Sequence, residues 1–425
     1  MNLSRNLPLF VAFRIGFNAR FYYPVLSVFF LDLGLSLEQY ALLNLAWALT
    51  IVACELPSGA LADLVGRRTL VVTAASLMTL EMLVLLFAPA GSPWLFPLLL
   101  LNRLISGLAE ACASGADEAL AYESIPAGPD HDNRWSRLLA TLGRCQSVAF
   151  MIVMFVGAAV YDPSLVGQSS GTPSRWPIAL TLLMALGSLA CALAMREPPR
   201  PSPRPGSLLL QPWRQIVRTA RWIAQTPRIL SLLAVGLSLD SVIRLFLTLE
   251  SNFLRMLGFP ERWFGPIAAA FSLVAFLIPT LARRMVLRWS APVNFSIAAT
   301  LALTAFFLLS APSVAWATAA LAPLAAAMSM NGLFVSYYLN RATDSAHRAT
   351  VLSFKGLSFN LAYGLVGMAY AGTVASLRTQ TVFPNENEAF RAALPAFPSL
   401  FLALILLASV LALRARSAPE RSQLN

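Results

Sequence analysis

The sequence is poor in charged residues and in side chains that bind metals. Charged residues make up 12% of its 425 residues, against about 25% in soluble domains, whereas hydrophobic residues make up 57%. It has only two histidines and four cysteines, and the cysteines show no paired spacing. We therefore expect neither a soluble globular domain nor a metal centre. The chain also lacks a phosphate-binding or dinucleotide-binding glycine motif, so no enzyme and no cofactor are expected.

Long apolar runs, in contrast, are abundant. A helix needs about 20 mostly apolar residues to cross a bilayer, because every backbone polar group must be satisfied inside the segment. The first run is too long for a cleaved signal peptide and lacks a small-residue cleavage site. The twelve predicted spans are 9–33, 38–58, 69–89, 94–121, 137–161, 176–195, 228–255, 263–282, 292–311, 314–339, 350–375 and 396–413. The sequence thus predicts an all-α integral membrane protein with twelve transmembrane helices.

Arginine is distributed unevenly between the two sides that these spans define. Twenty loop arginines fall on the side of the N-terminus and five on the other side. Cytoplasmic loops keep positive charge, so both termini are predicted to be cytoplasmic, in a cell inner membrane. The net charge of +11 then reflects topology and contact with anionic lipid headgroups, and nucleic-acid binding is not expected.

A proline- and arginine-rich stretch divides the chain almost in half. Residues 196–226 are predicted to form a cytoplasmic linker that proline stiffens, with a surface helix over 211–225 as a further prediction. Residues 1–195 and 227–425 would then form an N-terminal and a C-terminal six-helix bundle.

Cations inside the predicted spans recur in the two halves. At an offset of 224 residues Arg20 coincides with Arg244, and both lie near the middle of a span. At an offset of 211 residues Arg144 coincides with Lys355, the only lysine in the chain. A charge at the bilayer centre costs at least ~2.5–3.5 kcal/mol, so these side chains are predicted to be functional or paired.

The charged turn between the second and third spans carries a specific motif. Residues 59–68 read GALADLVGRR, which resembles the G-x-L-x-D-x-x-G-R-R/K loop of the major facilitator superfamily. The matching positions are Gly59, Leu61, Asp63, Gly66, Arg67 and Arg68. The resemblance implies two pseudo-symmetric six-helix bundles that transport a small molecule by alternating access, as a monomer in the lipid bilayer.

The same resemblance implies a gate at the cytoplasmic end. The residues predicted for this gating loop are Glu55, Gly59, Asp63, Gly66, Arg67 and Arg68. The glycines would allow tight turns, the aspartate would dock against the start of the eleventh span, and the arginines would pair with acids at the inner end of the fourth. These acids are Asp117, Glu118 and Glu123.

In the superfamily architecture the first, fourth, seventh and tenth spans line a central cavity, and the second, fifth, eighth and eleventh contribute its walls. On that map five cations would share one substrate cavity, namely Arg20, Arg103, Arg144, Arg244 and Lys355. Such a cavity would attract an anion, and the planar fork of arginine suits a carboxylate or a phosphate.

Acids inside the spans indicate a coupling ion, for which H⁺ is the prediction. Glu110 is the first candidate because it lies seven residues from Arg103, on roughly the same helical face, and Asp240 is the second. Internal pairing is the alternative: Asp240 stands one turn from Arg244, and Glu55, Glu110 or Asp240 could neutralise Arg20. Glu81 is expected to face a peripheral helix and is not favoured for coupling.

The predicted function is proton-coupled efflux of a small organic anion or amphiphile. Exchange or uptake of phosphate esters is one alternative, because an arginine on each of the first and seventh spans resembles the organophosphate antiporters. A drug/proton antiporter is another, although the fifth span keeps only Val156-Gly157-Ala158-Ala159 of the pattern typical of that group. A non-transporting sensor on the same fold is the third.

Overall fold

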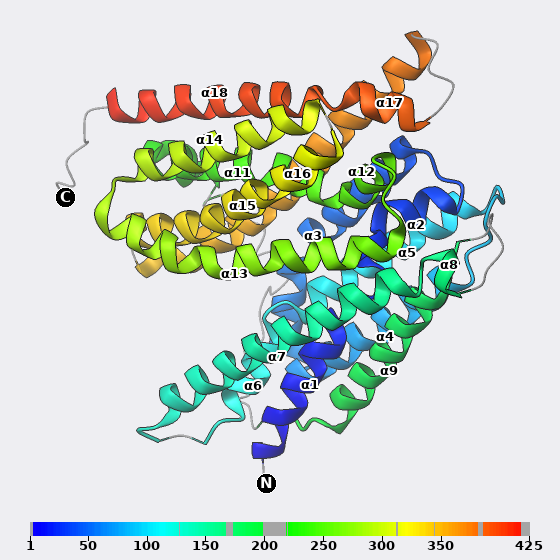
Figure 1. Cartoon of the computed structure of the whole chain (residues 1–425). Helices are drawn as coiled ribbons and strands as arrows, with labels where there is room; N and C mark the ends of the chain where they lie inside the picture. The colour runs from blue at the N-terminus through cyan, green and yellow to red at the C-terminus, as the bar shows by residue number, and fades with distance from the viewer. Residues whose placement is uncertain are drawn as a thin grey trace. The chain divides into compact units, whose positions relative to one another are not determined.

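The computed structural model describes residues 3–126, 128–166, 173–198, 218, 220–311, 313–343, 345–380 and 386–417. In these ranges helices are joined by turns and loops, and there is no β-strand (Figure 1). Two compact units form, one from Met1–Pro212 and Gly258–Ala269, the other from Trp213–Leu257 and Ala270–Asn425. The first unit contains η1 (Leu3–Arg5), α1 (Asn6–Asn18), η2 (Tyr23–Val25), α2 (Leu26–Asp32), α3 (Leu37–Val65), α4 (Arg67–Leu86), α5 (Leu95–Ala113), α6 (Ala116–Glu123), α7 (His131–Ala159), α8 (Pro163–Val166), α9 (Trp176–Ala194) and η3 (Glu261–Trp263). The second contains α11 (Pro227–Thr248), α12 (Glu250–Met256), α14 (Ala291–Ser310), α15 (Val314–Ala342), α16 (Ser345–Gln380), α17 (Glu386–Ala393) and α18 (Ala396–Ser417), while α13 (Phe264–Arg288) begins in the first unit and continues in the second.

Ten of the helical segments in the described ranges are long and apolar enough to cross a membrane. They coincide with ten of the twelve predicted spans. The remaining two are the first span, which is interrupted, and α16, whose 36 residues include polar side chains such as Lys355 and Asn360. The all-α, twelve-span architecture is therefore confirmed, with one span that is not a continuous helix.

The interruption of the first span lies between α1 and η2. The chain leaves α1 at Asn18, and Pro24 in η2 has no N–H with which to continue a helix. The Phe21 N–H donates to Thr181 Oγ1 of α9 at 3.0 Å, and the Phe21 carbonyl lies so close to Gly157 of α7 that a Cβ there would overlap it. Two neighbouring helices therefore hold the broken segment in place.

Local sequence signals set the ends of α3. Ser36 is the N-cap: its side chain accepts from the Gln39 N–H at 3.3 Å, and the Gln39 side chain accepts from the Ser36 N–H at 3.0 Å. At the other end Gly66 separates α3 from α4 with φ of 116°, a conformation that L side chains rarely adopt. The tight turn predicted at this glycine is present.

Each unit packs its helices around an apolar interior. In the first, α4 packs against α5 and α9, and α1 packs against α9 and α7 (Figure 1). In the second, α11 packs against α18, α15 and α16, and α14 packs against α15. Buried phenylalanines fill this second interior, where the rings of Phe306 and Phe397 stack with centroids 5.8 Å apart and Phe246 meets both edge-on.

Candidate substrate and coupling site

The interrupted first span places an arginine between two acids in the first unit. Arg20 is 2% exposed; its Nη1 lies 2.9 Å from Glu81 Oε2 and its Nη2 lies 3.2 Å from Glu110 Oε1. Glu81, from α4, is wholly buried, whereas the side chain of Glu110, from α5, is 35% exposed. The predicted Arg20–Glu110 pairing is present, and Glu81, which was not favoured, is the closer partner.

A polar chain extends from this cluster along α5. Asn102 donates from Nδ2 to the Glu81 carbonyl at 2.7 Å and accepts from Arg103 Nε at 3.2 Å. The Arg103 guanidinium lies 4.9 Å from the centroid of the Phe30 ring, and its Nη2 is buried without a hydrogen-bond partner. Arg103 therefore contacts Asn102 and Phe30 rather than Glu110, although the two share a helix.

The second unit holds a matching cluster on α11. Asp240 and Arg244, one turn apart, form an ion pair of 2.5 Å, as their spacing predicts. Arg244 also donates from Nη1 to Asn360 Oδ1 of α16 at 2.9 Å, and its guanidinium lies 5.6 Å from the Tyr363 ring centroid. The Arg244 side chain remains 30% exposed, so these partners do not enclose it fully.

The turn that follows α3 is tied to neighbouring helices. Arg67 forms an ion pair with Glu123 at the end of α6 and donates to the Ala119 carbonyl at 3.2 Å. Arg68 differs from the prediction: its guanidinium donates to the carbonyls of Met195 and Leu193 rather than to an acid, because the carbonyls at the end of α9 lack helical partners. Both backbone N–H groups donate to the Glu197 carboxylate.

The remaining acids named for the gate lie elsewhere. Asp117 and Glu118 each form an ion pair with Arg14 at 3.0 Å, and not with Arg67 or Arg68. Glu55 accepts from the Ser114 hydroxyl at 3.4 Å. The surroundings of Gly59 and the Asp63 side chain lie outside the described residues, so the predicted docking of Asp63 stays a prediction.

Comparison with known proteins agrees with this arrangement. The family model of the Major Facilitator Superfamily matches residues 9–368. The chain belongs to this superfamily.

Solved transporter structures share the fold at low sequence identity. The nucleoside transporter NupG superposes with a TM-score of 0.75 at 11% identity, covering 97% of this chain and 99% of its own. A bacterial homologue of the human lysosomal transporter Spinster, in an inward-facing and unoccupied conformation, gives 0.70 at 18%, covering 98% of both chains. A D-xylose–proton symporter gives 0.67 at 15%, covering 96% and 95%. No curated protein sequence matches the chain.

As a superfamily member the chain is a multi-pass membrane transporter rather than an enzyme. Of its five predicted cavity cations, Arg144 stands apart from the two clusters, whereas Lys355 lies close enough to Asp240 for their charges to interact. Arg144 is exposed on α7 and donates to the Ala140 carbonyl and the Thr141 hydroxyl of its own helix. Lys355 is half-buried on α16, with Nζ 5.9 Å from the Phe359 ring centroid. Neither forms an ion pair with any residue that the structure describes.

Four residues of the two clusters were not singled out for the site from the sequence. They are Glu81, Asn102, Asn360 and Tyr363. The available signal was polarity: an asparagine or glutamate in the middle of an apolar span is costly unless it has a partner. That signal identifies Glu81 as needing a cation, but the sequence does not say that the long Arg20 side chain reaches it.

Proposed function

We propose that this superfamily transporter couples the movement of a small organic anion to the movement of protons. The Arg20–Glu81–Glu110 cluster would carry the proton, and the Arg244 cluster would bind the anionic group of the substrate. The partial exposure of one acid in an otherwise buried cluster is the observation that carries this proposal.

The charges of the first cluster favour uptake of one proton. One arginine faces two carboxylates, so these three side chains have a net charge of −1 when all are ionised; Arg103, linked to Glu81 through Asn102, is not counted among them. An uncompensated charge away from water is costly, and binding one proton removes it. Glu81 is wholly buried, so Glu110, at 35% exposed, is the acid that can exchange a proton with water.

The second cluster has a net charge of the opposite sign. Arg244 and Lys355 contribute two positive charges near Asp240, which contributes one negative charge. A substrate with a single carboxylate or phosphate monoanion would neutralise the remaining charge, and the exposed part of Arg244 can donate to it. Together the clusters support one proton and one anion per transport cycle.

Reconstituted transport with a pH gradient tests the coupling. Glu110→Gln removes the exchangeable proton site, so we expect substrate exchange at equal pH to persist while gradient-driven movement is lost. Glu388→Gln is the matched control, because Glu388 is an exposed glutamate of α17 that lies outside the cluster and forms no ion pair with any residue in the described ranges. Gradient-driven transport that survives in Glu110→Gln would refute the assignment. Applying the gradient in both directions tests the predicted efflux.

Substrate class is tested by binding. The unfolding temperature of the protein is measured with organic anions, phosphate esters and cationic amphiphiles. A ligand that binds the folded protein raises this temperature. We expect stabilisation by anions, lost in Arg244→Gln and kept in Arg134→Gln, which changes an exposed arginine of α7. Stabilisation by cationic or neutral amphiphiles alone would mean that Asp240 satisfies Arg244, and would favour the drug/proton antiporter.

A further inference from the structure

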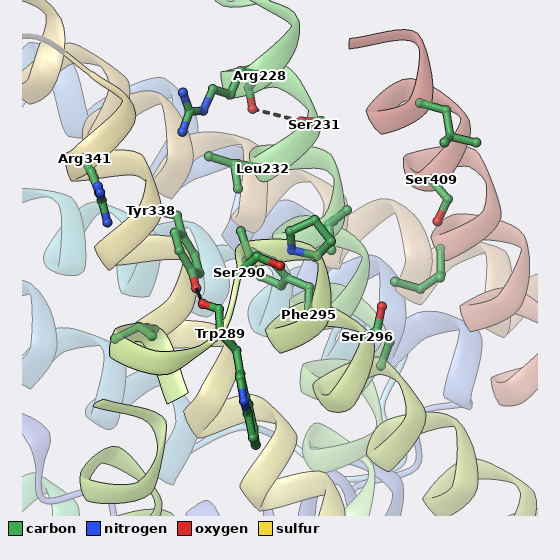
Figure 2. Close-up of a pocket in the computed structure, with 17 residues that line it drawn as sticks. Arg228, Ser231, Leu232, Trp289, Ser290, Phe295, Ser296, Tyr338, Arg341 and Ser409 are labelled. Carbon is green, nitrogen blue, oxygen red and sulfur yellow. Dashed lines mark hydrogen bonds between the residues drawn. The ribbon is translucent and has the colours of Figure 1, made fainter. Parts of the chain in front are cut away.

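A cavity of about 740 Å³ lies in the second unit, among α11, α13, α14, α15 and α18 (Figure 2). Its wall contains both apolar and polar side chains. The apolar residues include Leu232, Phe295 and Ile405. The polar ones include Arg228, Arg341, Ser290, Ser296 and Ser409. The cavity has the size of a pocket for a drug-sized ligand, and its lining is amphipathic.

The charge of the lining is purely positive. Arg228, from α11, and Arg341, from α15, both line the cavity, and no aspartate or glutamate does. Both arginines are exposed, and neither forms an ion pair with a residue in the described ranges. Figure 2 shows Arg228 at the top of the view and Arg341 at its left, with Tyr338 below both. Two unneutralised guanidinium groups near one opening favour an anion with several oxygen acceptors.

The backbone adds to this positive field. The twenty-residue helix α14 begins at the cavity, and its N-cap residue Ser290 makes no side-chain capping bond. The N–H groups of Ala291 and Val293 are therefore available to an anion at the positive end of the helix dipole, whereas Pro292 between them has no N–H. Tyr338 fixes this wall, because its hydroxyl donates to the Trp289 carbonyl at 3.3 Å and accepts from Asn294 Nδ2 at 2.6 Å.

The cavity lies at one end of the helices that line it, with Arg228 near the start of α11 and Arg341 near the end of α15. Trp289, directly after α13, is 49% exposed, and Leu287 and Leu413 are 69% and 61% exposed. Exposed tryptophan and arginine next to exposed leucines are typical of the boundary between lipid tails and headgroups. This end of the second unit is also the arginine-rich side, which the sequence predicts to be cytoplasmic.

We propose that this cavity binds an anionic phospholipid from the arginine-rich side of the membrane. The phosphate would lie between Arg228 and Arg341 near the start of α14, and an acyl chain would follow Leu232, Phe295 and Ile405. The site is separate from the substrate cluster, because Arg228 precedes Arg244 by sixteen residues on the continuous helix α11, ~24 Å along its axis. The proposal does not depend on the proposed transport function.

The test uses purified full-length protein depleted of lipid in detergent. Titration with phosphatidylglycerol should raise the unfolding temperature more than titration with phosphatidylcholine does. In Arg228→Gln/Arg341→Gln the apparent affinity for phosphatidylglycerol should fall about 30-fold, the effect of two arginines near an anionic lipid. Its unfolding temperature in phosphatidylcholine should equal that of the unmodified protein, which shows that it folds.

Arg284→Gln/Arg288→Gln is the matched control. This control also removes two positive charges, here near the end of α13. Neither Arg284 nor Arg288 lines this cavity, and Arg283 is left unchanged because it lines a neighbouring cavity. The control should bind phosphatidylglycerol within about twofold of the unmodified protein. An equal loss in both double variants would overturn the proposal, because it would mean diffuse attraction. Stabilisation by inorganic phosphate at the same concentrations would overturn the lipid as the occupant.

Discussion

Arg20 is buried between two acids, so substituting it affects the stability of the fold as well as the charge of the site. Its guanidinium has a wholly buried partner in Glu81, so the side chain helps to hold helices together as well as to carry charge. Arg244 is the better probe of substrate binding, because it is 30% exposed and its acid partner lies on its own helix.

We predict that Arg20→Met lowers the free energy of unfolding by about 3–5 kcal/mol, because it leaves Glu81 buried without a cation. Adding Glu81→Met should recover most of this loss, since well-packed apolar side chains can replace a buried ion pair. Unfolding in detergent measures both. Arg134→Met, at an exposed position of α7, should change the stability by less than about 0.5 kcal/mol. A double variant no more stable than Arg20→Met would contradict the pairing.

The sequence predicted part of this chemistry. The spacing of Asp240 and Arg244 was sufficient, because residues four apart on a helix share a face. Glu110 was recognised as an acid that could pair with Arg20, but Glu81 was set aside on the superfamily map. The reason is geometric, because Arg20 and Glu81 are 61 residues apart in the sequence. The helical period shows which residues share a face of one helix, but it does not show which face of one helix packs against another.

At the scale of an element, the break in the first span is the least expected feature. Apolar residues continue through 9–33, and no proline or glycine occurs between Asn18 and Tyr23, where the helix stops. Pro24 follows just after the break, and the segment between is held by Thr181 and Gly157, which lie in other helices. In contrast, the start of α3 and the turn at Gly66 follow from local residue types, which is why the sequence locates them.

Two glycines of α7 provide a direct test of this break. Gly157→Ala should destabilise the protein by at least about 1–3 kcal/mol, because the added Cβ would overlap the Phe21 carbonyl and force the backbone apart. Gly143→Ala is the control in the same helix, where nothing lies within 4 Å of the added Cβ, and it should be neutral or stabilising by up to about 1 kcal/mol. Equal unfolding temperatures for the two variants would rule out this close contact.

At the scale of the whole molecule, two stretches far apart in sequence meet within the first unit. Asp162, which follows α7, accepts from the Arg262 N–H at 3.1 Å and from the Ser164 hydroxyl, and Arg262 Nη1 lies 3.6 Å away. Residues 258–269 thus pack with helices of the first half, although the sequence places them after the linker. The linear division into 1–195, 196–226 and 227–425 stays a prediction, and most of the linker lies outside the described residues.

The Asp162 contact predicts a defined pH dependence. Burial alone would raise the pKa of Asp162, but hydrogen bonds from Ser164 and Arg262 lower it overall. Because the folded pKa is below the unfolded value of about 3.9, the carboxylate stabilises the fold above that pH and ceases to do so as the pH falls through the folded pKa. The difference in unfolding temperature between the unmodified protein and Asp162→Asn should be constant from pH 5 to 8 and shrink below about pH 4. A difference that changes near neutrality would assign it to another group.

Membrane orientation is the second prediction at this scale. The distribution of arginine predicts that the start of α7 is cytoplasmic and that α8 lies outside. A membrane-impermeant maleimide should therefore label Leu165→Cys in intact cells and Asp132→Cys only after permeabilisation; the two positions are 59% and 96% exposed. The four native cysteines lie in helices and are half-buried or buried, which keeps the background low. The opposite labelling pattern would invert the topology.

The position of Arg20 also has a consequence for biosynthesis. Its acid partners follow 61 and 90 residues later in the chain, and at about 5–20 residues per second the ribosome needs roughly 3–12 s to reach the first of them. During that time the first segment carries an arginine whose insertion alone costs ~2.5–3.5 kcal/mol. The first segment to be synthesised therefore cannot be the first to reach its final position. It does so only after α4, which carries Glu81, has entered the membrane.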